Sequence, residues 1–171
     1  DLRHIIRTIM NSHTYQASSI PNESNGDDAI NFSHSRERRL PAEALADALS
    51  RVADVPLEFS GYPIGTRAGE LPGVPFEKPR GAVRTPAEQF LKMFGKPARL
   101  QSCECERLGD PTLGQTFQLV SGELVNDLLT RRENRLGQLL SSGKSDAEIV
   151  DELFWTALSR SPSLEELNVT T

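Results

Sequence analysis

Three occurrences of one short pattern constrain the fold of this chain more than any other feature of its sequence. A serine or threonine precedes a glutamate by three residues at 85–88, 145–148 and 163–166. In such a capping box the hydroxyl accepts a hydrogen bond from the third helical residue, and the glutamate accepts one from the cap residue. Each box therefore predicts the start of a helix.

Apolar residues at helical spacing extend this prediction along most of the chain, with the widest apolar face at 149–158. Gly95 and Gly143 are placed to end two helices, and Gly122 to kink or restart another. Residues 99–105 are the best candidate for a strand. We therefore predict a mainly α fold, an irregular bundle of about six helices with at most one or two short strands. The helical segments are residues 2–12, 41–53, 85–94, 111–120, 123–129, 134–140, 145–158 and 163 onward.

Proline and glycine interrupt the helical pattern between Pro56 and Pro97, where seven of the 11 prolines and six of the 12 glycines lie. Proline lacks a backbone donor and disfavours regular structure. We predict that residues 56–84 form a long extended segment that wraps the helical core; an interdomain linker is the alternative. The scattered apolar side chains that favour wrapping are Phe59, Tyr62, Ile64, Leu71, Val74 and Phe76.

Residues 16–39 are rich in serine, asparagine and aspartate and have little periodicity, which predicts a long surface loop. A length of 171 residues suits one domain, so we predict a single helical domain over 1–171. The chain begins in helical periodicity without an initiator methionine, which indicates a fragment of a longer multidomain chain.

The charge pattern excludes two classes of partner. The chain has 19 basic and 24 acidic residues, a net charge of −5, and no basic stripe, so nucleic-acid binding is not expected. No apolar run approaches the roughly 18 residues that a membrane span needs. Of the basic residues 15 are arginine and 4 are lysine. Because the planar guanidinium group suits ion pairs, we predict that arginines hold the loop and the wrapping segment onto the helices.

A Cys-Glu-Cys motif at 103–105 is the most distinctive local feature. In a strand, Cys103 and Cys105 would point to the same face. We favour two ordinary buried thiols, because free cysteine is among the most buried residue types. A disulfide and half of a metal site remain as alternatives, and a metal site would need two further ligands. The three histidines are His4, His13 and His34. No two of them have the sequence spacing that is typical of metal ligands.

The sequence contains no Gly-x-Ser-x-Gly elbow, no phosphate-binding glycine loop, no His-Glu-x-x-His and no Cys-x-x-Cys-His haem motif. Arg39 stands four residues before Glu43, and we interpret this pair as a structural ion pair in preference to an anion site. We group seven polar residues as a candidate polar cluster, whose side chains would line one cleft. Its members are Arg7, Tyr15, Arg39, Glu43, Arg67, Glu104 and Arg107.

Short motifs in a fixed order cover nearly the whole chain. They include IIRTIMNS at 5–12, RRLPAE at 38–43, FGKP at 94–97, CECER at 103–107 and SRSP at 159–162. Together they resemble a planctomycete-specific C-terminal domain of unknown function that is found in large exported proteins, often with cytochrome-c-like domains. The resemblance implies a preceding domain in the parent chain, export to the periplasm or cell surface, and haem elsewhere in the parent chain. It implies no catalytic residue.

The leading functional hypothesis is a non-catalytic structural or binding module without a cofactor of its own. Its expected partner is the preceding domain of the same parent chain. The first alternative is half of a composite enzyme site for a polysaccharide or another polymer, built on the candidate polar cluster. The second is a metal or redox site at Cys103 and Cys105.

Overall fold

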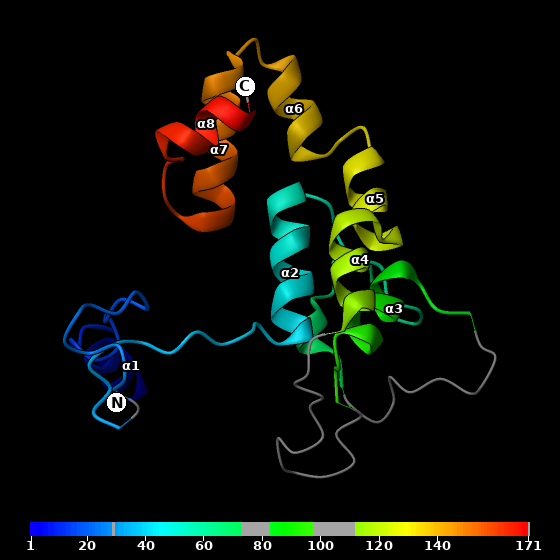
Figure 1. Ribbon diagram of the computed structural model, residues 1–171. Coiled ribbons are helices and arrows are strands. Elements are labelled where there is room, and N and C mark those ends of the chain that lie inside the picture. Colours follow the sequence, from blue (N-terminus) through cyan, green and yellow to red (C-terminus); the bar gives the residue numbers. More distant parts are fainter. Residues whose placement is uncertain (29, 73–82, 98–111, 171) are drawn as a thin grey trace. The chain divides into compact units, whose positions relative to one another are not determined.

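The computed structural model describes residues 1–28, 30–72, 83–97 and 112–170 (Figure 1). This part of the chain is mainly α, with eight α-helices, one 3₁₀ helix and no strand. The predicted irregular helical bundle is confirmed. The helices are α1 (Leu2–Met10), α2 (Ala42–Ala53), the 3₁₀ helix η1 (Ala68–Glu70), α3 (Pro86–Met93), α4 (Leu113–Ser121), α5 (Glu123–Thr130), α6 (Arg135–Ser141), α7 (Asp146–Leu158) and α8 (Leu164–Thr170).

The chain divides into two compact units, an N-terminal unit (Asp1–Arg39) and a C-terminal unit (Leu40–Thr171). The single-domain organisation over 1–171 stays a prediction. The candidate strand at 99–105 lies outside the described residues.

The only helix described in the N-terminal unit, α1, starts at a capping aspartate. The carboxylate of Asp1 accepts a hydrogen bond from the backbone N–H of Arg3 at 3.0 Å. No residue of α1 is buried, and its apolar stripe is 47% to 71% exposed. The stripe consists of Leu2, Ile5, Ile6, Ile9 and Met10.

The loop that follows α1 is organised around Asp28. The Asp28 carboxylate accepts hydrogen bonds from the hydroxyl of Ser33 and from the backbone N–H groups of Asn31, Ile30 and Ser33. These donors, led by the Ser33 hydroxyl, hold the pKa of Asp28 well below its usual range. Side-chain hydrogen bonds of this kind, to Asp28 and also to Asn22 and Asn25, support the loop in place of regular secondary structure.

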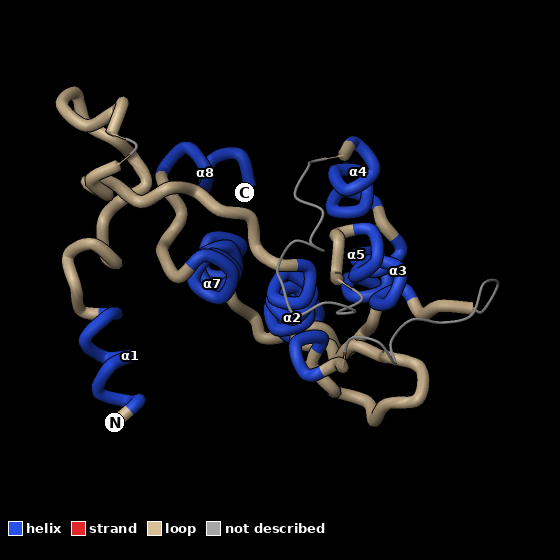
Figure 2. Tube along the Cα trace, turned by 90° about the horizontal axis from the view of Figure 1, so that it is seen from below, coloured by secondary structure: helices blue, strands red, loops and turns tan. Residues whose placement is uncertain are grey.

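Helix α2 is the central element of the C-terminal unit. It contacts η1, α3, α5, α6 and α7, and Figure 2 shows it between α7 on one side and α3 and α5 on the other. The side of α2 that carries Ala42 and Ala46 is buried in the core. The other core residues are Val55, Leu57, Phe59, Ala68, Leu71, Ala87, Phe90, Leu91, Leu124 and Leu128.

The extended chain after α2 packs against this core. Phe59 and Leu71 are buried, as the wrapping prediction requires. Ile64 is 74% exposed, so its predicted burial is wrong. Ile64 stands in a turn between Gly61 and Gly65, which both have positive φ, and this turn carries its side chain away from the core. Val74 and Phe76 lie outside the described residues.

Two buried or half-buried carboxylates fix the extended chain. Both oxygens of Asp47 on α2 accept hydrogen bonds from η1, from the N–H groups of Ala68 at 2.7 Å and Gly69 at 3.1 Å. Glu88 on α3 accepts one from the N–H of Ser60 at 2.8 Å. The wrapping segment is therefore attached by hydrogen bonds as well as by apolar contacts.

The capping boxes are confirmed. The hydroxyl and the glutamate make the reciprocal hydrogen bonds in each of the three predicted boxes, which begin α3, α7 and α8. A fourth box that was not predicted begins α4 and uses glutamine in place of glutamate: Thr112 with Gln115. Because Thr112 is the cap, α4 starts at Leu113 instead of Pro111.

Gly122 separates α4 from α5 and is the C-cap of one helix and the N-cap of the other. A Cβ atom at this position would lie 2.3 Å from the carbonyl oxygen of Gln118 and 2.7 Å from its Cα. Both are backbone atoms, which cannot move aside as a flexible side chain can. The predicted restart at this glycine is thus confirmed, and such breaks raise the helix number above six.

We expect Gly122→Ala to lower the free energy of unfolding by about 2 kcal/mol, because the added methyl group overlaps the backbone of α4. Gly114→Ala is the matched control, since the nearest atoms to its Cβ, Thr112 Oγ1 and Met93 Sδ, lie at 3.8 and 3.9 Å. This control should raise stability by about 0.5–1 kcal/mol. Urea denaturation followed by circular dichroism measures both; equal effects of the two variants would contradict the close approach at Gly122.

Candidate functional site

The candidate polar cluster is only partly described by the structure. Arg7, Tyr15 and Arg39 belong to the N-terminal unit, and Glu43 and Arg67 to the C-terminal unit. Residues 98–111, which contain Glu104 and Arg107 and the pair Cys103 and Cys105, lie outside the described residues. The composite polar cleft and the metal or redox site therefore stay predictions.

Glu43 is buried in the first turn of α2, with its side chain 6% exposed. Its Oε1 lies 3.4 Å from Nζ of Lys96, whose side chain is 2% exposed. A pair of charges removed from water in this way is strongly destabilising when one partner is lost. The contact ties the chain that follows α3 to the start of α2, which is a structural role for Glu43.

Arg67 lies at a polar hollow of about 510 Å³ beside α2. Asp47, Arg51 and Asp54 line the same hollow. The Asp47 carboxylate is already occupied by the N–H groups of η1. Of the predicted cluster, Arg67 alone lines this hollow among the residues that the structure describes.

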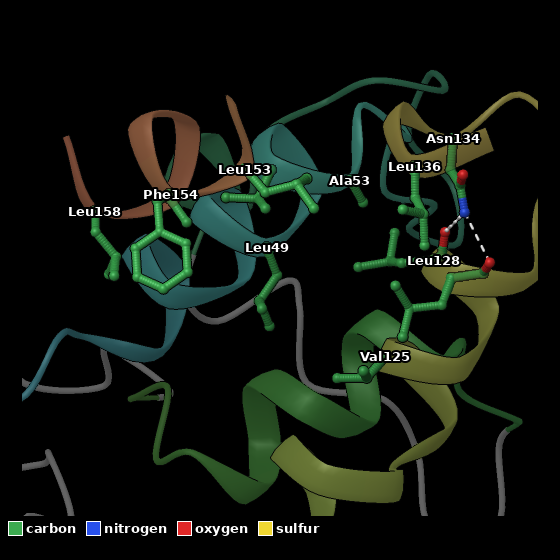
Figure 3. Close-up of a pocket in the computed structure, with 12 residues that line it drawn as sticks. Leu49, Ala53, Val125, Leu128, Asn134, Leu136, Leu153, Phe154 and Leu158 are labelled. Carbon is green, nitrogen blue, oxygen red and sulfur yellow. Dashed lines mark hydrogen bonds between the residues drawn. The ribbon is translucent and has the colours of Figure 1, made fainter. Parts of the chain in front are cut away.

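A second hollow, which we call the apolar groove, lies between α2, α5, α6 and α7 and has a volume of about 400 Å³ (Figure 3). That volume falls within the range of ligand pockets in proteins. In Figure 3 the ring of Phe154 on α7 lies between Leu158 and Leu49 of α2. The groove is lined by Leu49, Val52, Ala53, Val125, Leu128, Leu129, Asn134, Leu136, Leu153, Phe154, Ala157 and Leu158.

Among the described residues of this lining Asn134 alone is polar, and both polar atoms of its side chain are hydrogen-bonded inside the protein. Its Nδ2 donates to the carbonyl oxygens of Leu128 at 3.1 Å and Leu129 at 2.7 Å. Its Oδ1 accepts from the N–H of Gly137 at 2.7 Å, which makes Asn134 the N-cap of α6. Asn134 therefore joins the end of α5 to the start of α6.

The apolar groove continues into a further hollow of about 350 Å³ between α6, α7 and α8. Leu136, Leu153 and Phe154 line both hollows. The further hollow adds Leu140, which is 63% exposed, and Ile149 on α7. The two hollows therefore form one apolar surface that runs along α7.

The turn between α7 and α8 supports the wall of the groove. Arg160 forms a bidentate ion pair with Glu166, in which both N–O distances are 2.8 Å. The guanidinium carbon of Arg160 lies 5.4 Å from the ring centre of Phe154. Trp155, the neighbour of Phe154, is 53% exposed and donates from its indole nitrogen to the Ser161 hydroxyl at 3.0 Å. These contacts fix α8 to the end of α7.

The sequence located one wall of the groove and missed the others. The apolar face predicted at 149–158 is present, although only Ile149 within it is fully buried. The contribution of α5 and α6 was not predicted. The helix predicted at 134–140 is present as α6, and Asn134 is its N-cap.

The fold defines an all-α domain, and the comparison with protein families identifies it. The family model PSD1, protein of unknown function (DUF1553), matches residues 1–171, and the chain belongs to this family. No curated protein and no solved structure matches the chain. Over the described ranges, no helix has the length and apolar character needed to cross a membrane.

Replacement of Asn134 by alanine should lower the free energy of unfolding by about 2–3 kcal/mol, because it removes a helix cap and leaves the carbonyl groups of Leu128 and Leu129 unpaired. Asn126→Ala is the matched control, since Asn126 is exposed and its Nδ2 donates to one carbonyl, that of Ser121. We expect the control to lower the free energy of unfolding by less than about 1 kcal/mol. Thermal and urea unfolding measure both, and a mild effect at Asn134 would contradict its role as the α5–α6 joint.

The ion pair between Arg160 and Glu166 lowers the pKa of Glu166 from its ordinary value of 4.5 to about 2, with the N–H of Ser163 as the next cause. A depressed carboxylate pKa stabilises the folded state above pH 4.5, and this stabilisation is lost as the pH falls toward 2. Carboxyl NMR titration should therefore give a pKa of about 2 for Glu166 in the wild type. In Arg160→Gln the midpoint should return toward 4.5; an unchanged midpoint would show that the pair does not form in solution.

Proposed function

We propose that this chain is a non-catalytic docking module that binds the preceding domain of its parent chain through the apolar groove. The proposal places the module near the C-terminus of an exported planctomycete protein, in which a cytochrome-c-like domain elsewhere in the chain carries the haem. The observation that carries it is the apolar groove, in whose described lining Asn134 alone is polar and has both polar atoms of its side chain hydrogen-bonded inside the protein.

The chemistry of the groove supports binding in preference to catalysis. General acid–base or nucleophilic catalysis needs a titratable or nucleophilic group that can reach the substrate. None of the described residues that line the apolar groove is titratable. Burial of apolar surface gives binding energy without such a group.

Exposed apolar side chains at the groove support the same conclusion. Leu129 and Leu158 line the groove and are each 55% exposed. Clustered apolar exposure of this kind is typical of interaction sites. The exposed stripe of α1, described above, is a second unpartnered apolar surface within the N-terminal unit.

The test measures binding between this chain and the domain that precedes it in the parent gene, with both purified separately and mixed in a calorimeter. We expect Leu129→Gln with Leu158→Gln to weaken binding by about 2 kcal/mol, or roughly thirtyfold, because each leucine loses about half of its full burial energy. Glutamine adds no charge, and both positions are exposed enough to spare the fold.

Ile64→Gln is the control for this experiment. Ile64 is 74% exposed and lies in the turn between Gly61 and Gly65, outside the residues that line the apolar groove. Binding should be unchanged in this control. A folded chain that does not bind the preceding domain, or a double variant that binds it as well as the wild type does, would refute the docking function.

A further inference from the structure

The helix that forms one wall of the apolar groove is strongly acidic. Helix α7 carries Asp146, Glu148, Asp151 and Glu152 and no basic residue. Asp146 itself lines the hollow that continues the groove between α6, α7 and α8. Among the residues that the structure describes, no lysine or arginine lines either hollow, so this surface is apolar with an acidic edge.

Two of these four carboxylates already have partners within the protein. Glu148 accepts from the N–H of Ser145 at 2.8 Å, as part of the capping box. Glu152 is paired with Lys144. Within the described ranges, no ion pair or hydrogen bond engages the carboxylates of Asp146 and Asp151. These two charges are therefore available to a partner.

Cations on the neighbouring elements are held elsewhere. Arg160 is paired with Glu166, and Arg131 with Asp127 and Glu58. The guanidinium group of Arg135 donates to the carbonyl oxygen of Val52 at 3.0 Å. The other nearby cations, Arg51 on α2 and Arg132 in the α5–α6 turn, line neither of the two hollows.

The groove also constrains the backbone of its occupant. Backbone N–H and C=O groups must find partners when they leave water. The groove offers none, because the hydrogen-bonding groups of Asn134 are occupied and no sheet edge is present among the described elements. A helix satisfies its own backbone and presents apolar side chains at regular spacing, and it therefore fits this surface.

We propose that the occupant of the apolar groove is an amphipathic helix with lysine or arginine beside its apolar stripe. This inference rests on the proposed docking function and names the chemistry of the partner. The apolar stripe enters the two hollows that share Leu136, Leu153 and Phe154. The cationic flank lies against Asp146 and Asp151. Such charge pairs at a rim speed association and select the partner more than they add affinity.

The test uses two synthetic 15-residue peptide probes with the same leucine stripe at helical spacing. One probe carries lysine at every polar position and the other carries glutamate. Fluorescence anisotropy of the labelled peptides measures binding to the whole 171-residue chain. We expect the lysine peptide to bind at least tenfold more tightly at low salt, with the difference shrinking as the salt concentration rises.

Protein variants separate local pairing from general attraction to a chain of net charge −5. In Asp146→Asn with Asp151→Asn the preference for the lysine peptide should fall below threefold. Glu23→Gln with Asp27→Asn removes the same charge from residues that line neither hollow and should leave the preference intact. Leu129→Gln with Leu158→Gln should abolish binding of both peptides. Thermal unfolding of each variant verifies that it is folded.

The outcomes distinguish this inference from the proposed function. Equal binding of both peptides, or a preference that survives in Asp146→Asn with Asp151→Asn, overturns the cationic partner and leaves apolar docking standing. If the chain forms a dimer, and the double variant Leu129→Gln with Leu158→Gln is a monomer, the groove binds a second copy of the chain. That result overturns the inference. If neither peptide binds but the preceding domain does, only the inference fails; if neither peptide nor domain binds, both fail.

Discussion

The C-terminal unit depends on the burial of one helix, α2, among five neighbouring elements. Its alanines at 42 and 46 are 2% and 0% exposed, and such small side chains let the core residues around them pack closely. The C-terminal half of α2 supplies Leu49, Val52 and Ala53 to the apolar groove. One helix is therefore both the centre of the core and a wall of the candidate site, so the geometry of the site follows from the packing of the core.

Polar side chains hold the elements around α2 in register. Glu88 links α3 to the wrapping segment, Lys96 links the chain after α3 to Glu43, and Asn134 links α5 to α6. Each lies in or beside apolar surroundings, where an unpaired polar group would be costly. Apolar burial supplies most of the driving force in such a domain, and these hydrogen bonds select one arrangement of the helices.

The local structure was predictable because it is encoded over three or four residues. The boxes at Thr85 and Ser145 marked helix starts correctly, and Gly122 marked a helix break. The apolar groove was not predictable in the same way, since one of its walls, α2, lies far in the sequence from the other three, α5, α6 and α7. The prediction that Ile64 is buried was wrong for a related reason. Its apolar character favoured burial, but the turn in which it stands directs its side chain into water.

The position of Trp155 gives this protein an optical reporter of its own. Trp155 is the single tryptophan in the chain and stands on α7 beside Phe154, with about half of its surface in water. Its hydrogen bond to Ser161 spans the joint between α7 and α8. Intrinsic fluorescence therefore comes largely from the joint between α7 and α8, and its wavelength reports the polarity at that joint without any added label.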